Sequence, residues 1–203
     1  MATQSFLVIS GIALTLGGAL QALASPAHLS NRDPNSVKSN MWVPVAITLG
    51  CSYLFISIGI SGVYLRQGEQ TGIIGLIGFI LALLGSLLAL PISFITAFVI
   101  PYVAKQESYS KTPLDLLGAK GPIPGIFNLL LGYIFLLMPG FVLFGIATIR
   151  AGVFPPLAGW LVLFGIVISQ SGNMVLKLTF LRNVGGVLFG LGLAWHGVVL
   201  LLG

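Results

Sequence analysis

The chain has 203 residues and a formal net charge of +5, with 57% hydrophobic residues and only 6% charged ones. A soluble globular domain carries about 25% charged residues, so this composition excludes an ordinary water-facing surface. The nine Lys and Arg residues are scattered and form no basic run, which argues against a nucleic-acid-binding patch. We expect a single membrane domain over residues 1–203, with the lipid bilayer as a partner and no nucleic acid.

The charged residues are confined to segments between long apolar stretches. The stretches without Asp, Glu, Lys or Arg are each at least 21 residues long: 1–31, 39–65, 70–104, 121–149, 151–176 and 183–203. About 20 apolar helical residues cross the hydrocarbon core of a bilayer. The pattern predicts an all-α polytopic membrane helix bundle with six transmembrane helices, at about 5–24, 41–65, 72–104, 123–149, 155–172 and 184–202.

The third predicted span is too long for a simple crossing. Residues 72–104 would rise about 50 Å as a helix, whereas the apolar core of a bilayer is about 30 Å thick. Pro91 lies inside the span and removes a backbone donor. We expect either a kink near residues 89–91 or a helix that continues past the membrane surface toward Pro101.

Two short segments of the sequence echo each other. Arg66, Gly68 and Gly75 recur as Arg150, Gly152 and Gly159, at an offset of 84 residues. The echo predicts that spans two–three and four–five are copies of one helical hairpin, although chance matches are also expected in a chain with 27 glycines. Gly68 and Gly152 would let the chain reverse, and Arg66 and Arg150 would contact lipid headgroups or the carbonyls at a helix end.

The second of these hairpins resembles a known sequence pattern. The segment GIATIRAGVFPPLAGWLVLFG (145–165) is similar to a hairpin that recurs in uncharacterised six-span bacterial integral membrane proteins, and residues 62–85 match it more loosely. The resemblance implies a six-span fold in a bacterial plasma membrane. It implies no activity.

The orientation in the membrane has two opposite indications. Two of the basic residues, Arg66 and Arg150, fall on the side of the termini, and seven fall on the side of the longer loops. The positive-inside rule then places the longer loops in the cytoplasm. The apolar first span and the resemblance favour the reverse, so the orientation stays undecided.

The predicted spans contain few side chains that could ionise or bind a metal. None contains Asp or Glu, which argues against a proton-coupled transporter. His196 is the only ionisable side chain well inside a predicted span. It is therefore a candidate ligand of haem iron or chlorophyll magnesium. The alternative is that it forms a hydrogen bond to a neighbouring helix. No His or Cys spacing predicts a metal site, and the lone Cys51 forms no internal disulfide.

Amide and glycine residues suggest contacts between the spans. The amides Gln21, Asn128, Gln170 and Asn173 would bond across helices, or line a polar pocket if they converge. Small residues allow two helix backbones to approach closely, either within the chain or against a partner. The candidates for such packing are Gly75, Gly78, Gly85, Gly186 and Gly190.

The scarcity of chemistry in the spans favours a non-enzymatic role. The first prediction is an accessory or structural subunit of a larger membrane complex, with membrane-protein partners or self-association and with no cofactor. The alternatives are a small channel or carrier for a neutral or apolar molecule, and a pigment- or haem-binding membrane protein or membrane enzyme. The sequence identifies neither a substrate nor a partner.

Overall fold

The computed structural model describes residues 2–108, 110–122, 125–174 and 178–203, and within these ranges the chain is helical with no β-strand. This confirms the all-α prediction. The long helices are α1 (Ala2–Ala27), α2 (Trp42–Phe94), α5 (Ile126–Ala151), α6 (Pro156–Met174) and α7 (Thr179–Leu202). Shorter elements lie between them: the 3₁₀-helix η1 (Pro34–Lys38), the π-helix η2 (Ile95–Val99), α3 (Ile100–Gln106) and α4 (Pro113–Leu117).

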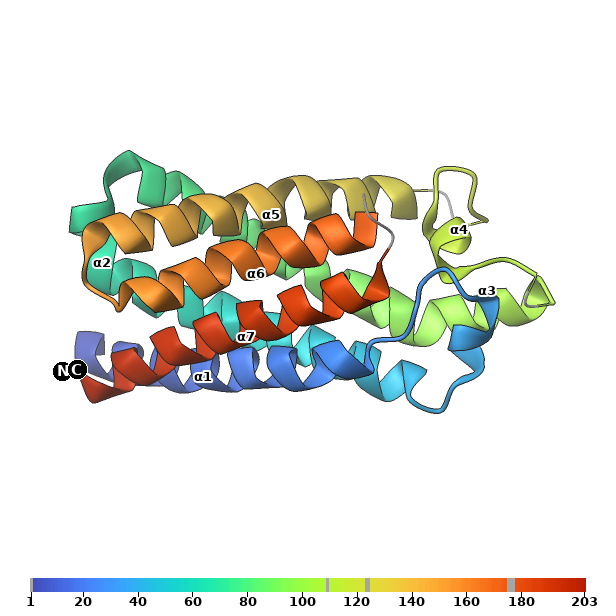
Figure 1. Ribbon diagram of the computed structural model, residues 1–203, viewed down its shortest axis with the longest axis horizontal. Coiled ribbons are helices and arrows are strands. Elements are labelled where there is room, and N and C mark those ends of the chain that lie inside the picture. Colours follow the sequence, from blue (N-terminus) through green and yellow to red (C-terminus); the bar gives the residue numbers. More distant parts are fainter. Residues whose placement is uncertain (1, 109, 123–124, 175–177) are drawn as a thin grey trace.

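Helix α2 folds back on itself at Gly72. This residue has φ 58° and ψ −154°, a conformation that glycine adopts without steric cost. The arms on either side of it, 42–71 and 73–94, are antiparallel: Tyr64 stacks on Phe79 near the bend, and Gly50 lies against Ser93 far from it (Figure 1).

The expectation of a loop at 66–72 with its reversal at Gly68 was wrong. The helix continues through Thr71, because Arg, Gln and Glu favour helical backbone there, and the chain turns only at Gly72. Gly152 does have a left-handed conformation, with φ 66°, where α5 ends. The two turns are therefore built differently, and the hairpin duplication stays a prediction.

The long helices form a closed ring. Helix α1 packs against α2 and α7, α7 packs against α6, α6 against α5, and α5 against α2. Figure 1 shows both chain ends, the bend of α2 and the α5–α6 turn at one end of the bundle, and α3, α4 and the longer loops at the other. The side chains of Phe141, Phe144, Phe154 and Phe189 fill the centre of the ring.

Several helices are long and apolar enough to cross a membrane. In the described residues these stretches are Thr3–Ala27, Trp42–Gln106, Ile126–Ala151 and Thr179–Leu202, and Pro156–Gly172 is a shorter apolar helix. Large apolar side chains such as Phe135, Phe164 and Phe180 are more than half exposed on the outside of the bundle. A surface of this kind is suited to lipid rather than water.

Close backbone contacts hold neighbouring helices together. A Cβ atom on Gly78 would come within 2.6 Å of the Phe144 nitrogen on α5, and one on Gly190 within 2.5 Å of the Ala22 nitrogen on α1. Gly85 likewise faces α5, and Gly186 faces α1. Gly75 differs, because it lies against the Thr71 side chain at the bend of α2 rather than against another helix.

Beyond Pro91 the helical backbone continues from α2 through η2 and α3 to Gln106. Pro91 lies within the α-helix, and the departure from α-helical bonding comes at η2, where the Ile100 N–H donates to the Ile95 carbonyl, five residues back. Pro101 has no N–H to continue this pattern to the Thr96 carbonyl. That carbonyl instead accepts a hydrogen bond of 2.8 Å from Trp42 Nε1.

Candidate binding cavity

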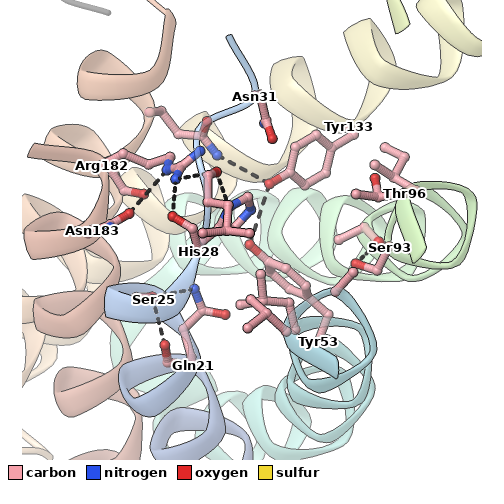
Figure 2. Close-up of a pocket in the computed structure, with 18 of the residues that line it drawn as sticks. Gln21, Ser25, His28, Asn31, Tyr53, Ser93, Thr96, Tyr133, Arg182 and Asn183 are labelled. Carbon is pink, nitrogen blue, oxygen red and sulfur yellow. Dashed lines mark hydrogen bonds between the residues drawn. The ribbon is translucent and has the colours of Figure 1, made fainter. Parts of the chain in front are cut away.

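A cavity of about 150 Å³ lies between the helices at the end of the bundle that carries the longer loops (Figure 2). Both arms of α2 line it together with α1, α5, α6, α7, the segment after α1, and α4. Its lining includes many polar side chains: Gln21, Ser25, His28, Asn31, Tyr53, Ser93, Thr96, Tyr133, Ser169, Gln170, Arg182 and Asn183. A polar cavity between apolar helices is unusual, because a buried polar group is costly unless it has a partner.

Arg182 supplies a buried positive charge to this cavity. The side chain is only 8% exposed. Its Nη2 donates to the carbonyls of His28 (2.6 Å) and Leu29 (2.9 Å), and its Nε donates to Asn183 Oδ1 (3.2 Å). These carbonyls follow the end of α1, where backbone acceptors lack partners in the helix.

The charge of Arg182 has no counter-charge in the cavity. The lining residues include no Asp or Glu, and all the hydrogen bonds of Arg182 go to neutral oxygens. Within the described residues, Nη1 of Arg182 makes no hydrogen bond. Two N–H donors of the guanidinium are therefore available to a molecule in the cavity.

The sequence pattern placed Arg182 in a loop, and this was wrong. Helix α7 begins at Thr179 rather than near residue 184, since residues 179–183 include no Gly or Pro that would break a helix. A signal was present in the spacing: Arg182 precedes Gly186 by four residues, so both lie on the face of α7 that meets α1.

A pair of tyrosines lies on another wall of the cavity. The hydroxyls of Tyr53 and Tyr133 are 3.4 Å apart, and Gln170 Nε2 donates to the Tyr133 oxygen at 3.3 Å. The pair has two hydroxyl hydrogens and uses one of them between its members. The other hydrogen has no acceptor within this group, whichever tyrosine carries it.

A second polar group joins α1 to α2. Ser52 Oγ donates to the Gly17 carbonyl (2.9 Å) and lies 3.2 Å from Gln21 Oε1, while Ser25 Oγ donates to the Gln21 carbonyl (2.7 Å). Gln21 Nε2 is 3.4 Å from Ser25 Oγ. Gln21 is thus held in place by its own hydrogen bonds.

His28 is neutral at physiological pH. Burial and the nearby Arg182 charge lower its pKa from 6.5 to about 4. Its Nδ1 lies 2.9 Å from the Leu29 carbonyl, so this nitrogen carries the proton and Nε2 has a free lone pair. Arg182 is therefore the charged group of the cavity.

Of the four amides expected to converge, the structure brings two together. Gln21 and Gln170 line the cavity, whereas Asn128 is not part of its lining. The side chain of Asn173 lies outside the described residues. The tyrosine pair, Ser25 and Arg182 were not predicted as cavity residues, because sequence spacing does not show which faces of distant helices meet.

The other candidate residues lie away from the cavity. His196 is 1% exposed: its Nδ1 donates to the Gly192 carbonyl at 2.7 Å, its ring packs on Phe154, and its Nε2 has no partner among the described residues. Arg66 is partly exposed and Arg150 is exposed, both near the opposite end of the bundle. The described residues contain no cluster of three His, Cys, Asp or Glu side chains placed to hold a metal ion.

Comparisons of the chain with protein-family models, with curated proteins and with solved structures find no match. The geometry of the cavity is therefore the basis for a functional interpretation. The cavity contains a buried guanidinium with free N–H groups and a pair of hydroxyls with a spare hydrogen, and the bundle around it has an apolar exterior.

Proposed function

We propose that the chain is an integral membrane protein with six spans, and that its bundle binds a small polar molecule or carries it across the membrane. The two arms of α2 each supply one span, in addition to α1, α5, α6 and α7. Helix α6, with 19 residues, rises about 28 Å, close to the thickness of the hydrocarbon core.

The convergence of polar groups carries this proposal. Tyr53, Tyr133, Gln170 and Arg182 come from four different helical segments and line one cavity. Polar and charged side chains within a membrane bundle are costly and commonly mark a path or a site. An accessory subunit that only packs against partners has no need of such a cavity, so binding is favoured over the subunit role predicted from the sequence.

The cavity can be filled without changing the lipid-facing surface. We choose Ser93→Leu, which adds apolar volume to the lining, and Cys51→Leu as a matched control on an exposed position of the same helix. Native mass spectrometry of the protein extracted in mild detergent should detect a small adduct on the parent chain and on C51L. The adduct should be lost from S93L.

Two results would contradict this function. Absence of an adduct from the parent chain under several extraction conditions would argue against a binding protein. Migration on a native gel only as part of a fixed larger assembly would favour the accessory subunit. A visible absorption spectrum of the same sample tests the pigment- or haem-binding alternative, since bound haem or chlorophyll would absorb strongly.

A further inference from the structure

We infer that the cavity binds an oxyanion, a carboxylate or phosphate group, with Arg182 as its charge partner. This inference rests on the proposed function, because it names the chemical class of the molecule that occupies the same cavity. It differs from the neutral or apolar cargo of the channel or carrier that was an alternative in the sequence analysis.

Charge is the first argument for an anionic ligand. Arg182 is more than nine-tenths buried, and no acidic side chain lines the space beside it. The other titratable lining groups are His28, Tyr53 and Tyr133, and none of them carries a negative charge at neutral pH. A buried cation is stabilised by an anion brought within a few ångströms, whereas a neutral or apolar ligand would leave it uncompensated.

The arrangement of donors is the second argument. Arg182 Nη1 has two unused N–H groups, and the Tyr53–Tyr133 pair has one unused O–H. Figure 2 shows these side chains directed toward the same space from different helices. Carboxylate and phosphate oxygens accept from several donors at once, and a guanidinium binds them with a planar fork.

The volume limits the size of the ligand. A cavity of about 150 Å³ is of the size that holds one benzene-sized molecule. Inorganic phosphate and short-chain carboxylates are of this size. The phosphate of a lipid headgroup has the same chemistry, with its acyl chains outside the cavity, so the two sources need separate experimental arms.

Trp42 provides a signal for binding because it lines the cavity and is 4% exposed. We would titrate the purified full chain in neutral detergent with butyrate, with inorganic phosphate and with butyramide, the neutral analogue of butyrate, following tryptophan fluorescence and heat. A parallel arm compares nanodiscs of phosphatidylcholine alone with nanodiscs that contain phosphatidylglycerol. We expect butyrate, phosphate or phosphatidylglycerol to bind at least tenfold more tightly than the uncharged or zwitterionic counterpart.

Variants identify the residue that recognises the anion. Arg182→Gln should weaken binding at least tenfold, and Arg182→Lys, which keeps the charge but loses the fork, should weaken it less. The Y53F/Y133F double variant leaves Arg182 intact and removes both hydroxyls, and with them the spare O–H donor, so it should weaken binding several-fold even if R182Q does not fold. Arg150→Gln, an exposed position at the other end of the bundle, should have no effect.

The possible failures are distinguishable. If butyramide binds as tightly as butyrate, or if R182K and the Y53F/Y133F variant both bind anions like the parent chain, the oxyanion inference is wrong while the binding function stands. If no probe binds and native mass spectrometry detects no adduct, both are wrong. Binding to phosphatidylglycerol alone supports the inference and identifies a lipid headgroup as the source.

Discussion

His28 lies beside a buried cation, and this position determines how the protein responds to acid. Its pKa is about 4 in the folded chain, against 6.5 for an unperturbed imidazole. Between these values the unfolded chain takes up a proton and the folded chain does not, so stability falls as the pH drops from about 6.5 to about 4. We expect a loss of about 1–3 kcal/mol over this range, measured as a decrease in Tm of the detergent-solubilised protein.

His28→Gln should reduce this pH dependence, because the amide does not titrate. Asp115 does not interfere: its pKa lies below 3.8, lowered by hydrogen bonds from Thr112, so its contribution changes at a lower pH. An equal slope of Tm against pH in H28Q and in the parent chain would contradict this assignment.

His196 is a buried acceptor without a partner, and its removal tests the ligand hypothesis. Its Nε2 has no hydrogen-bond partner among the described residues, while its Nδ1 bonds a carbonyl of its own helix. His196→Leu should leave stability unchanged or raise it by about 1 kcal/mol, since an unpaired polar atom is replaced by an apolar group. Thermal unfolding measures this; a decrease in Tm together with loss of a visible absorption band would instead indicate a pigment ligand.

At the scale of elements, the π-helix η2 depends on one tryptophan. Trp42 Nε1 donates to the Thr96 carbonyl, which Pro101 leaves without a backbone donor. Trp42→Phe should destabilise the fold by about 1–3 kcal/mol by leaving that carbonyl unpaired. Pro101→Ala supplies an N–H that can bond this carbonyl. The W42F/P101A double variant should therefore lose less free energy of unfolding than the sum of the losses in the two single variants. Chemical unfolding of the four proteins measures this difference as a coupling energy. Additive losses would contradict this account.

The contact between α2 and α5 depends on glycine at one position and not at another. A Cβ on Gly85 would lie 2.5 Å from the Leu137 Cα, whereas one on Gly132 would meet only Leu88, at 3.6 Å. Gly85→Ala should destabilise by about 1–3 kcal/mol because it pushes the helices apart. Gly132→Ala should be neutral or stabilise by up to about 1 kcal/mol through helix propensity. Equal Tm values for the two variants would contradict the packing argument.

The helix ends in the structure agree with those predicted from the apolar pattern where a Pro or Gly interrupts that pattern. Elsewhere they differ from the prediction. Gly152 ends α5 near the predicted boundary. At residues 66–71 and 179–183, however, charged residues that favour helix were interpreted as loops, and the helices continue through them. Charge indicates exposure to water or to a cavity, and it does not by itself end a helix.

For the whole molecule, the proposed spans place specific loops on opposite sides of the membrane. In a Cys51→Ser background, we would introduce single cysteines at Glu69, Lys120, Arg150 and Leu178, all exposed. In sealed vesicles, an impermeant thiol reagent should label Glu69→Cys and Arg150→Cys from one face and Lys120→Cys and Leu178→Cys from the other. The side that reacts also determines the orientation. Labelling of Arg150→Cys and Leu178→Cys from the same face would show that α6 does not span.

The sequence predicted the helices better than it predicted their partners. Long stretches without charge identify apolar helices, because contact with lipid and packing inside a helix bundle both require apolar side chains. The closed ring and the cavity depend on which faces meet: Tyr53 and Tyr133 are 80 residues apart, and only packing brings their hydroxyls together. The carbonyls that bond Arg182 likewise lie about 150 residues before it in the chain.

Helix α7 packs on both α6 and α1 and carries Arg182. During synthesis this helix leaves the ribosome after all the other described helices. Until it is inserted, the glycine-bearing face of α1 lies open to lipid, and the cavity lacks both a wall and its charge. A nascent chain would therefore gain the proposed binding site only once α7 is inserted, and products truncated before α7 would enter the bilayer unable to bind.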